Sequence, residues 1–283
     1  MKVLLSSDSE GIVLLTSDSS GKVLLKSNSL SSVLLNGEAP SPPILLTALL
    51  TNATTIELTY DEDLDVNSIP ALGDYLFTWS NDLVDIDNNV YNEVIIGTQV
   101  WIIENLKTTK YADGSTIPNI TDNTQWSNDA AGGMCYYNND GATYKANYGA
   151  LYNWHAVNNA AGLAKLTRDG LDQNYRVPTL TDFQTLKTYL ANNGGKLKET
   201  GITHWTTPNA GATNESGFTA VGSGIRSNSG VFTNINIICS LWASTAGDQS
   251  NAWRVHLDYN STTILIAGLT KEYGGSVRLI RNL

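Results

Sequence analysis

Apolar triplets recur every ten residues at the start of the chain, separated by serine-rich and mostly glycine-containing spacers. The twelve apolar positions are Val3, Leu4, Leu5, Val13, Leu14, Leu15, Val23, Leu24, Leu25, Val33, Leu34 and Leu35. A ten-residue period does not hold the triplets on one side of a helix, so each triplet predicts a short strand and each spacer a turn. One such unit cannot bury its own apolar face, and the repeats must therefore pack against something else.

We predict that residues 1–40 form a β stem that joins copies of the chain, with a trimer favoured, or that attaches the chain to a larger particle. Four units hold too few large apolar side chains for an independent core. Two alternatives stay open at this point. The repeats form a flexible serine-rich arm, or they dock as strands on the rest of their own chain.

A small acidic β segment is predicted for residues 41–83, after a proline-rich linker. Residues 55–60 and 75–79 show the alternation of strands, and between them lies a run that contains Asp61, Asp63 and Asp65. The run resembles a strand end of bacterial Ig-like surface modules. Carboxylate oxygens suit calcium, but the loop lacks the glycine and the closing glutamate of a calcium loop. A solvated acidic turn is the favoured interpretation, with calcium as the alternative.

The remaining residues, 84–283, mix short strands with two predicted helices. Residues 84–101 indicate strand, turn and strand. Residues 148–158 place Leu151, Trp154 and Val157 on one helical face. Residues 181–192 share an apolar face of Phe183, Leu186 and Leu190, with Thr179 or Thr181 as the capping residue. Helices beside many irregular strands predict an α+β domain.

Charge and composition exclude several classes of protein. The 283 residues carry a formal net charge of -10, and residues 27–106 contain 12 acidic and no basic side chains. No basic stripe is present, so nucleic acid is not expected as a partner. No apolar run is long enough to span a membrane, and the N-terminus lacks the apolar stretch of a secretory signal. Two cysteines, Cys135 and Cys239, allow one disulfide or two reduced thiols.

Motifs that would indicate catalysis are absent from the sequence, and we expect the protein not to be an enzyme. No nucleophile elbow or phosphate-binding loop occurs. His155, His204 and His256 have no spacing that indicates a shared metal, so no cofactor is expected. Glu199 and Glu215 leave a glycan-acting enzyme as an alternative, with the two carboxylates as a glycosidase pair.

A series of short segments carries a family resemblance. They are Ile96–Trp101 with Glu104–Leu106, Tyr148–Trp154, Tyr175–Thr179, Gly195–Gly201, Asn214–Ala220, Leu241–Thr245 and Gly275–Arg278. In this order they resemble the Fibrobacter succinogenes major paralogous domain family over roughly residues 84–283. That family is similar to C-type-lectin-like domains and, more distantly, to the formylglycine-generating enzyme fold. The resemblance implies a C-type-lectin-like domain with two helices and an exposed binding face formed by its last strands.

The last strands show the alternation of a half-buried strand. Trp253, Val255, Leu257 and Tyr259 alternate with the polar side chains at positions 254, 256, 258 and 260. We predict a ligand-binding face that comprises Trp242, Arg254, His256, Asp258, Asn260, Thr262, Ile264 and Ile266. Some domains of this kind are diversified by adenine-directed mutagenesis of asparagine codons, which reaches every residue from 264 to 270. Residues 254–270 are therefore either a hypervariable surface or an ordinary core strand or subunit contact.

These observations favour a bacteriophage virion appendage, a fibre or spike, that binds a host-surface glycan or protein. The missing export signal agrees with assembly of a virion in the host cytoplasm, and the N-terminus is expected to contact other virion proteins. Several heads on one stem gain avidity. The alternative is a bacterial cell-surface adhesin or a carbohydrate-binding module.

Overall fold

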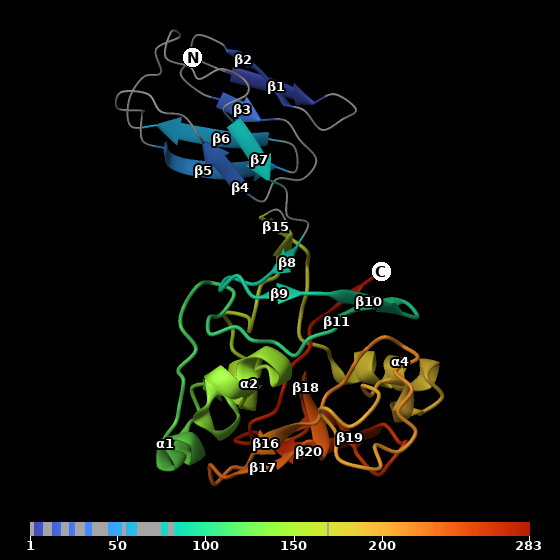
Figure 1. Ribbon diagram of the computed structural model, residues 1–283. Coiled ribbons are helices and arrows are strands. Elements are labelled where there is room, and N and C mark those ends of the chain that lie inside the picture. The colour runs from blue at the N-terminus through green and yellow to red at the C-terminus, as the bar shows by residue number, and fades with distance from the viewer. Residues whose placement is uncertain are drawn as a thin grey trace. The chain divides into compact units, whose positions relative to one another are not determined.

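The computed structural model describes residues 82–168 and 170–283 and, before them, the backbones of seven strands (Figure 1). Those strands are β1 (Val3–Ser7), β2 (Val13–Ser17), β3 (Val23–Leu25), β4 (Ser32–Leu35), β5 (Leu45–Asn52), β6 (Thr55–Tyr60) and β7 (Tyr75–Thr78). The chain divides into two compact units. The first contains residues 1–82 and 167–172, and the second contains residues 83–166 and 173–283.

In the first unit, the triplets of the ten-residue repeat lie in strands, as the period predicts. Five strands form one sheet in the order β2-β1-β3-β6-β5, and β4 pairs with β7. The repeat strands therefore pair with each other and with strands of the following acidic segment. Strands β14 (Thr167–Arg168) and β15 (Leu171–Asp172) form a hairpin. The aspartates of the proposed calcium loop lie outside the described residues.

The second unit contains several small sheets. Its strands are β8 (Leu83–Val84), β9 (Val90–Tyr91), β10 (Glu93–Ile96), β11 (Gln99–Ile102), β12 (Met134–Cys135), β13 (Leu151–Tyr152), β16 (Ser223–Arg226), β17 (Phe232–Ile235), β18 (Ile238–Ala246), β19 (Asn251–Asp258), β20 (Leu265–Thr270) and β21 (Ile280–Asn282). Two sheets have three strands, in the orders β10-β11-β21 and β18-β19-β20. The predicted strand-turn-strand at 84–101 is present, with Gly97 at a φ of 63° in the β10–β11 turn.

The helices of the second unit are short. They are α1 (Asn123–Asn128), α2 (Gly141–Tyr148), α3 (Trp154–Val157) and α4 (Leu180–Tyr189), with the 3₁₀ helices η2 (Tyr137–Asn139) and η3 (Gly194–Lys196). The longest, α4, has 10 residues, so no helix among the described residues could cross a membrane.

The helix predicted at 148–158 is wrong. Helix α2 ends at Gly149, whose φ is 72° and whose added Cβ would lie 2.7 Å from the Asn105 Cβ. The next residues, Leu151 and Tyr152, pair with β12 and are both buried. Asn153 then caps the short helix α3 through its side chain, which accepts from the Ala156 amide. The apolar residues of this segment therefore lie in two elements: Leu151 in a buried strand, and Trp154 and Val157 in the single helical turn that follows.

The second predicted helix is confirmed as α4. Thr179 is its N-cap, and Thr179 and Asp182 form a reciprocal capping box. Asp182 also accepts hydrogen bonds of 2.6 and 3.0 Å from the Arg176 guanidinium. Burial raises the pKa of Asp182, but the hydrogen bonds from Arg176 and Thr179 outweigh it and lower the pKa below 3.8.

The predicted α+β, C-type-lectin-like architecture is wrong. Strands dominate the described residues, and they form several small sheets joined by long loops with four short helices among them. The loops turn at residues with positive φ, most of which are asparagine or glycine. One of the two predicted helices breaks at such a glycine, and the other, α4, flanks a groove that is described below.

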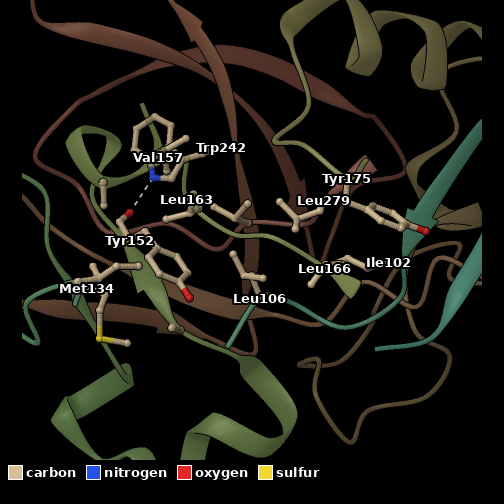
Figure 2. Packing of buried hydrophobic residues seen from close by; sticks show 14 of the residues in the cluster. Ile102, Leu106, Met134, Tyr152, Val157, Leu163, Leu166, Tyr175, Trp242 and Leu279 are labelled. Atoms are coloured by element: carbon tan, nitrogen blue, oxygen red, sulfur yellow. Dashed lines mark hydrogen bonds between the residues drawn. The ribbon is translucent and has the colours of Figure 1, made fainter. Parts of the chain in front are cut away.

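Two apolar clusters form most of the core. In one, Trp242 lies beside Tyr152 and donates a hydrogen bond of 2.9 Å to its carbonyl oxygen (Figure 2). In the other, Trp101 stacks on Phe183 of α4 and meets the edge of Phe218. The second cluster therefore holds α4 against the strands that precede and follow it.

Candidate binding site

Strands β18, β19 and β20 form an antiparallel sheet with two different faces. Directly paired residues share a face, and successive residues alternate between faces. Val255 pairs with Leu241 and Ile266, and these three residues face α4 and its apolar cluster. Arg254 pairs with Trp242 and Ala267 on the opposite face. The sheet thus has an α4 face and a polar face.

The polar face carries three of the predicted binding residues in one row. Arg254 donates from Nη1 to His256 Nδ1 at 2.7 Å, and more weakly to Ser240 Oγ at 3.4 Å. His256 Nε2 lies 3.6 Å from an Asp258 carboxylate oxygen. All three side chains are half-buried. Sequence alternation correctly places them together.

The contact between Arg254 and His256 fixes the charge state of the imidazole. A guanidinium has no acceptor, so His256 Nδ1 accepts the bond and the proton of the neutral ring sits on Nε2, toward Asp258. Burial lowers the pKa of His256 below 6.5, and the neighbouring Arg254 lowers it further, while Asp258 opposes both. His256 is therefore neutral at physiological pH, and Arg254 carries the positive charge of the row.

The other predicted residues do not lie in this row. Trp242 and Ile264 have no exposed surface, so they belong to the core and cannot contact a ligand. Ile266 points to the α4 face. Asn260 and Thr262 are exposed in the turn after β19. Of the eight predicted residues, the structure therefore places only Arg254, His256 and Asp258 in one row. The others lie in the core, on the α4 face or in the turn after β19.

Strand β20 lies at the edge of its sheet, and its residues vary in exposure. Ile264, just before the strand, is buried, whereas Leu265 is 48% exposed beside His256. Ile266 is half-buried on the α4 face. The segment that we considered as a hypervariable surface therefore contributes to both faces of the sheet and to the core.

An open groove of about 610 Å³ lies between α4 and the α4 face of the sheet. It is lined by Leu180, Gln184, Lys187, Thr188, Ala191, Asn192, Trp253 and Ile266. Trp253 is half-buried against the second apolar cluster and contributes to the wall of the groove. Figure 1 shows α4 beside β19.

The polar side of the groove is missing from the sequence prediction. Gln184 and Lys187 are three residues apart on α4 and form a short polar stripe that borders the groove, and Ala191 follows just after the helix. That polar stripe is visible in the sequence, but solvated helix faces look the same. The alternation in the sequence shows which residues share a face with Trp253, but not how far that face is covered.

Lys198 is a buried cation that no pattern in the sequence indicates. Its ammonium donates to the carbonyl oxygens of Ala210, Asp258 and Ser261 at 2.9, 3.0 and 3.0 Å. Burial lowers its pKa to about 8, while the negative charge of Asp258 opposes this shift. Lys198 therefore holds the end of β19, where the polar row stops, against the loop at Ala210.

The residues considered for catalysis lie in separate contacts. Both carboxylate oxygens of Glu199 lie within hydrogen-bond distance of His204 Nδ1, at 3.0 and 2.9 Å, and Glu215 pairs with Lys196 at 2.9 Å. Across residues 82–168 and 170–283, no three histidine, cysteine or acidic side chains come together as a metal site. Cys135 and Cys239 are free and buried, and burial raises their pKa values to about 12 and about 11.

The fold and the groove define a loop-rich β domain with a three-stranded sheet that borders a groove on its α4 face and carries a polar row on its other face. Comparison with known families assigns it: residues 94–281 match the Fibrobacter succinogenes major domain, and the chain belongs to this family. The family resemblance seen in the sequence is thereby confirmed. Neither the curated proteins nor the solved structures compared with the chain gave a match.

Proposed function

We propose that the protein is a bacteriophage virion appendage whose C-terminal unit binds a host-surface glycan or protein. The observation that carries this proposal is the groove between α4 and the sheet. Its volume of about 610 Å³ lies within the usual range of small-molecule sites, roughly 300–1,000 Å³. Trp253 supplies an aromatic surface, and Gln184 and Lys187 supply hydrogen-bond donors.

The chemistry of this groove suits a sugar ring. The apolar C–H face of a hexose packs on an aromatic ring, while its hydroxyl groups need amide and ammonium partners. Neither the amide of Gln184 nor the ammonium of Lys187 has a hydrogen-bond partner among the described residues. Both groups are therefore available to a ligand that reaches Trp253.

The N-terminal repeats support the appendage part of the proposal. Their triplets lie in strands, and β1, β2 and β3 share one sheet. We propose that this part of the chain joins three copies or attaches them to other virion proteins. Several heads on one particle would then bind a cell surface by avidity. A bacterial cell-surface adhesin or carbohydrate-binding module is the alternative, which uses the same groove in another setting.

A binding assay with the full chain tests the groove. We expect Trp253→Ala to weaken binding to host cells, or to a positive spot on a glycan array, by at least about tenfold. Tyr189→Ala is the control. Tyr189 is a 63% exposed aromatic residue of α4, and it does not line the Trp253 groove. Equal loss in the two variants, or no loss with Trp253→Ala, contradicts the proposed site.

Light scattering of the full chain tests the oligomer. The proposal expects a mass three times the 30.5 kDa of one chain. A mass of 30.5 kDa contradicts a trimeric stem and leaves the groove untouched. Sedimentation of the labelled chain with purified virions then tests whether the appendage belongs to the particle.

A further inference from the structure

Arg254 is a half-buried cation with no carboxylate partner among residues 82–168 and 170–283. The hydrogen bonds of its guanidinium come from Nη1 alone, to His256 and Ser240. Its Nε is buried and has no acceptor. A buried charge without a counter-ion is unfavourable, and burial accordingly lowers the pKa of Arg254 from 12.5.

The second terminal nitrogen, Nη2, is not fully buried, and no described oxygen accepts a hydrogen bond from it. Arg254 therefore presents an unused donor and an uncompensated positive charge at one point of the row. An incoming anion would satisfy both.

We infer that Arg254, with His256 beside it, binds the carboxylate of an acidic sugar on the polar face of the sheet. This site lies on the side opposite the Trp253 groove, and it goes beyond the proposed function without depending on it. Guanidinium groups bind carboxylates with short, charge-assisted hydrogen bonds.

The charge pattern of the row favours a sugar acid over other anions. Arg254 and Asp258 are four residues apart on β19, which corresponds to about 13 Å along a strand. Arg254, at the positive end, can donate hydrogen bonds to one carboxylate. Asp258, at the negative end, can accept hydrogen bonds from neutral hydroxyl groups. An oligosaccharide carries both groups, whereas a peptide rich in carboxylates would meet Asp258 with like charge. Leu265, 48% exposed beside His256, offers an apolar contact for the sugar ring.

Proton uptake by His256 couples this site to pH. The charged and titratable groups around the ring are Arg254 and Asp258 on β19, with Tyr273 and Cys239 facing Arg254 and with Lys198 beside Asp258. Protonation of His256 places a second positive charge beside Arg254, which is unfavourable without a ligand and favourable with a bound carboxylate. Carboxylate binding should therefore tighten as the pH falls below about 6.5.

Calorimetric titration of the full chain with trigalacturonate and with its methyl ester tests the inference. The two probes share one sugar skeleton, and esterification removes the negative charge of each carboxyl group and adds a methyl group. We expect trigalacturonate to bind at least about tenfold more tightly than the ester, and Arg254→Gln to remove this difference. Lys145→Gln is the matched control, because it deletes one positive charge on α2, at a residue that lies outside both the Trp253 groove and the polar row.

A second variant keeps the test valid if Arg254→Gln does not fold. His256→Gln retains an acceptor for Arg254 but cannot take up a proton. It should bind trigalacturonate as the wild type does at about pH 8, and lose the gain in affinity at about pH 5.

Several outcomes overturn the inference. They are equal affinity for the two probes, no binding of either probe, an equal loss with Lys145→Gln, and tighter binding of triglutamate than of trigalacturonate. None of them bears on the Trp253 groove, whose own test uses Trp253→Ala.

Discussion

Replacement of Lys198 by methionine should destabilise the second unit strongly. The substitution keeps the length and the apolar stem of the side chain but removes the ammonium. Three carbonyl oxygens, of Ala210, Asp258 and Ser261, then lose a donor at 2.9–3.0 Å. Hydrogen bonds to a charged group contribute about 1.5–3 kcal/mol each, but these three residues are half-exposed and water can replace part of the loss.

We therefore expect Lys198→Met to lower the free energy of unfolding by about 3 kcal/mol, less than the sum of three separate bonds. For a unit of this size, about 1 kcal/mol corresponds to roughly 2–4 °C, so Tm should fall by about 6–12 °C. Urea unfolding followed by tryptophan fluorescence measures this, since six of the seven tryptophans lie in the second unit.

Lys196→Met is the matched control for this experiment. Lys196 lies two residues away, and its ammonium pairs with Glu215, whose side chain is 63% exposed. Surface pairs of this kind contribute about 0–1 kcal/mol. A loss below about 1 kcal/mol for Lys198→Met, or equal losses for the two variants, would refute the reasoning that Lys198 ties the loops together.

Three further predictions concern a glycine turn, a helix cap and the titration of His256. Gly149→Ala should lower the free energy of unfolding in urea by about 2–4 kcal/mol, because its φ is 72° and the new Cβ would lie 2.7 Å from the Asn105 Cβ. Gly201→Ala is the control. Its φ is 80° but the space around it is open, so it should cost about 1 kcal/mol. Thr179→Ala should lower the free energy of unfolding by about 1 kcal/mol through loss of the α4 cap, and an unchanged urea midpoint would contradict that role. The pKa of His256 is lowered on folding, so its contribution to stability is present above about pH 6.5 and is lost as the pH falls through the folded value. His256→Gln should therefore show a smaller drop in urea midpoint between about pH 7.5 and pH 5 than the wild type, and an equal drop would count against this sign.

The accuracy of the sequence predictions follows the range of the interactions that decide each element. Helix α4 is predictable because its cap, Thr179, and its partner, Asp182, are three residues apart. The alternation of β19 is equally local, and it correctly separates Arg254 and His256 from Val255. The helix predicted at 148–158 fails because a distant contact decides it: Gly149 lies against Asn105, and Leu151 pairs with Cys135.

The candidate site was predictable only in part for the same reason. The polar row belongs to one strand, so its members appear together in the sequence. The groove needs α4 to pack beside β19, which depends on contacts such as that of Trp101 with Phe183. No local pattern shows that Trp253 borders this groove, or that Trp242 is fully buried.

The buried cations of the second unit separate a structural role from a binding role. Arg226 donates to four oxygen atoms, those of Ile120, Thr121, Asn123 and Gly230, and all three of its guanidinium nitrogens have partners. Arg278 is satisfied in the same way by the oxygens of Asn105, Phe218 and Thr219, and it stacks on the Phe218 ring.

Such cations fix loops that have few regular backbone hydrogen bonds, and Lys198 belongs with them because its ammonium makes three such bonds. Arg254 differs from all three. It has a buried Nε without an acceptor and an Nη2 that is not fully buried and has no described partner, so its guanidinium ties down no loop that the structure describes. Arg226, Arg278 and Lys198 are thus satisfied by described oxygen atoms, whereas Arg254 keeps the unused donors on which the inferred carboxylate site rests.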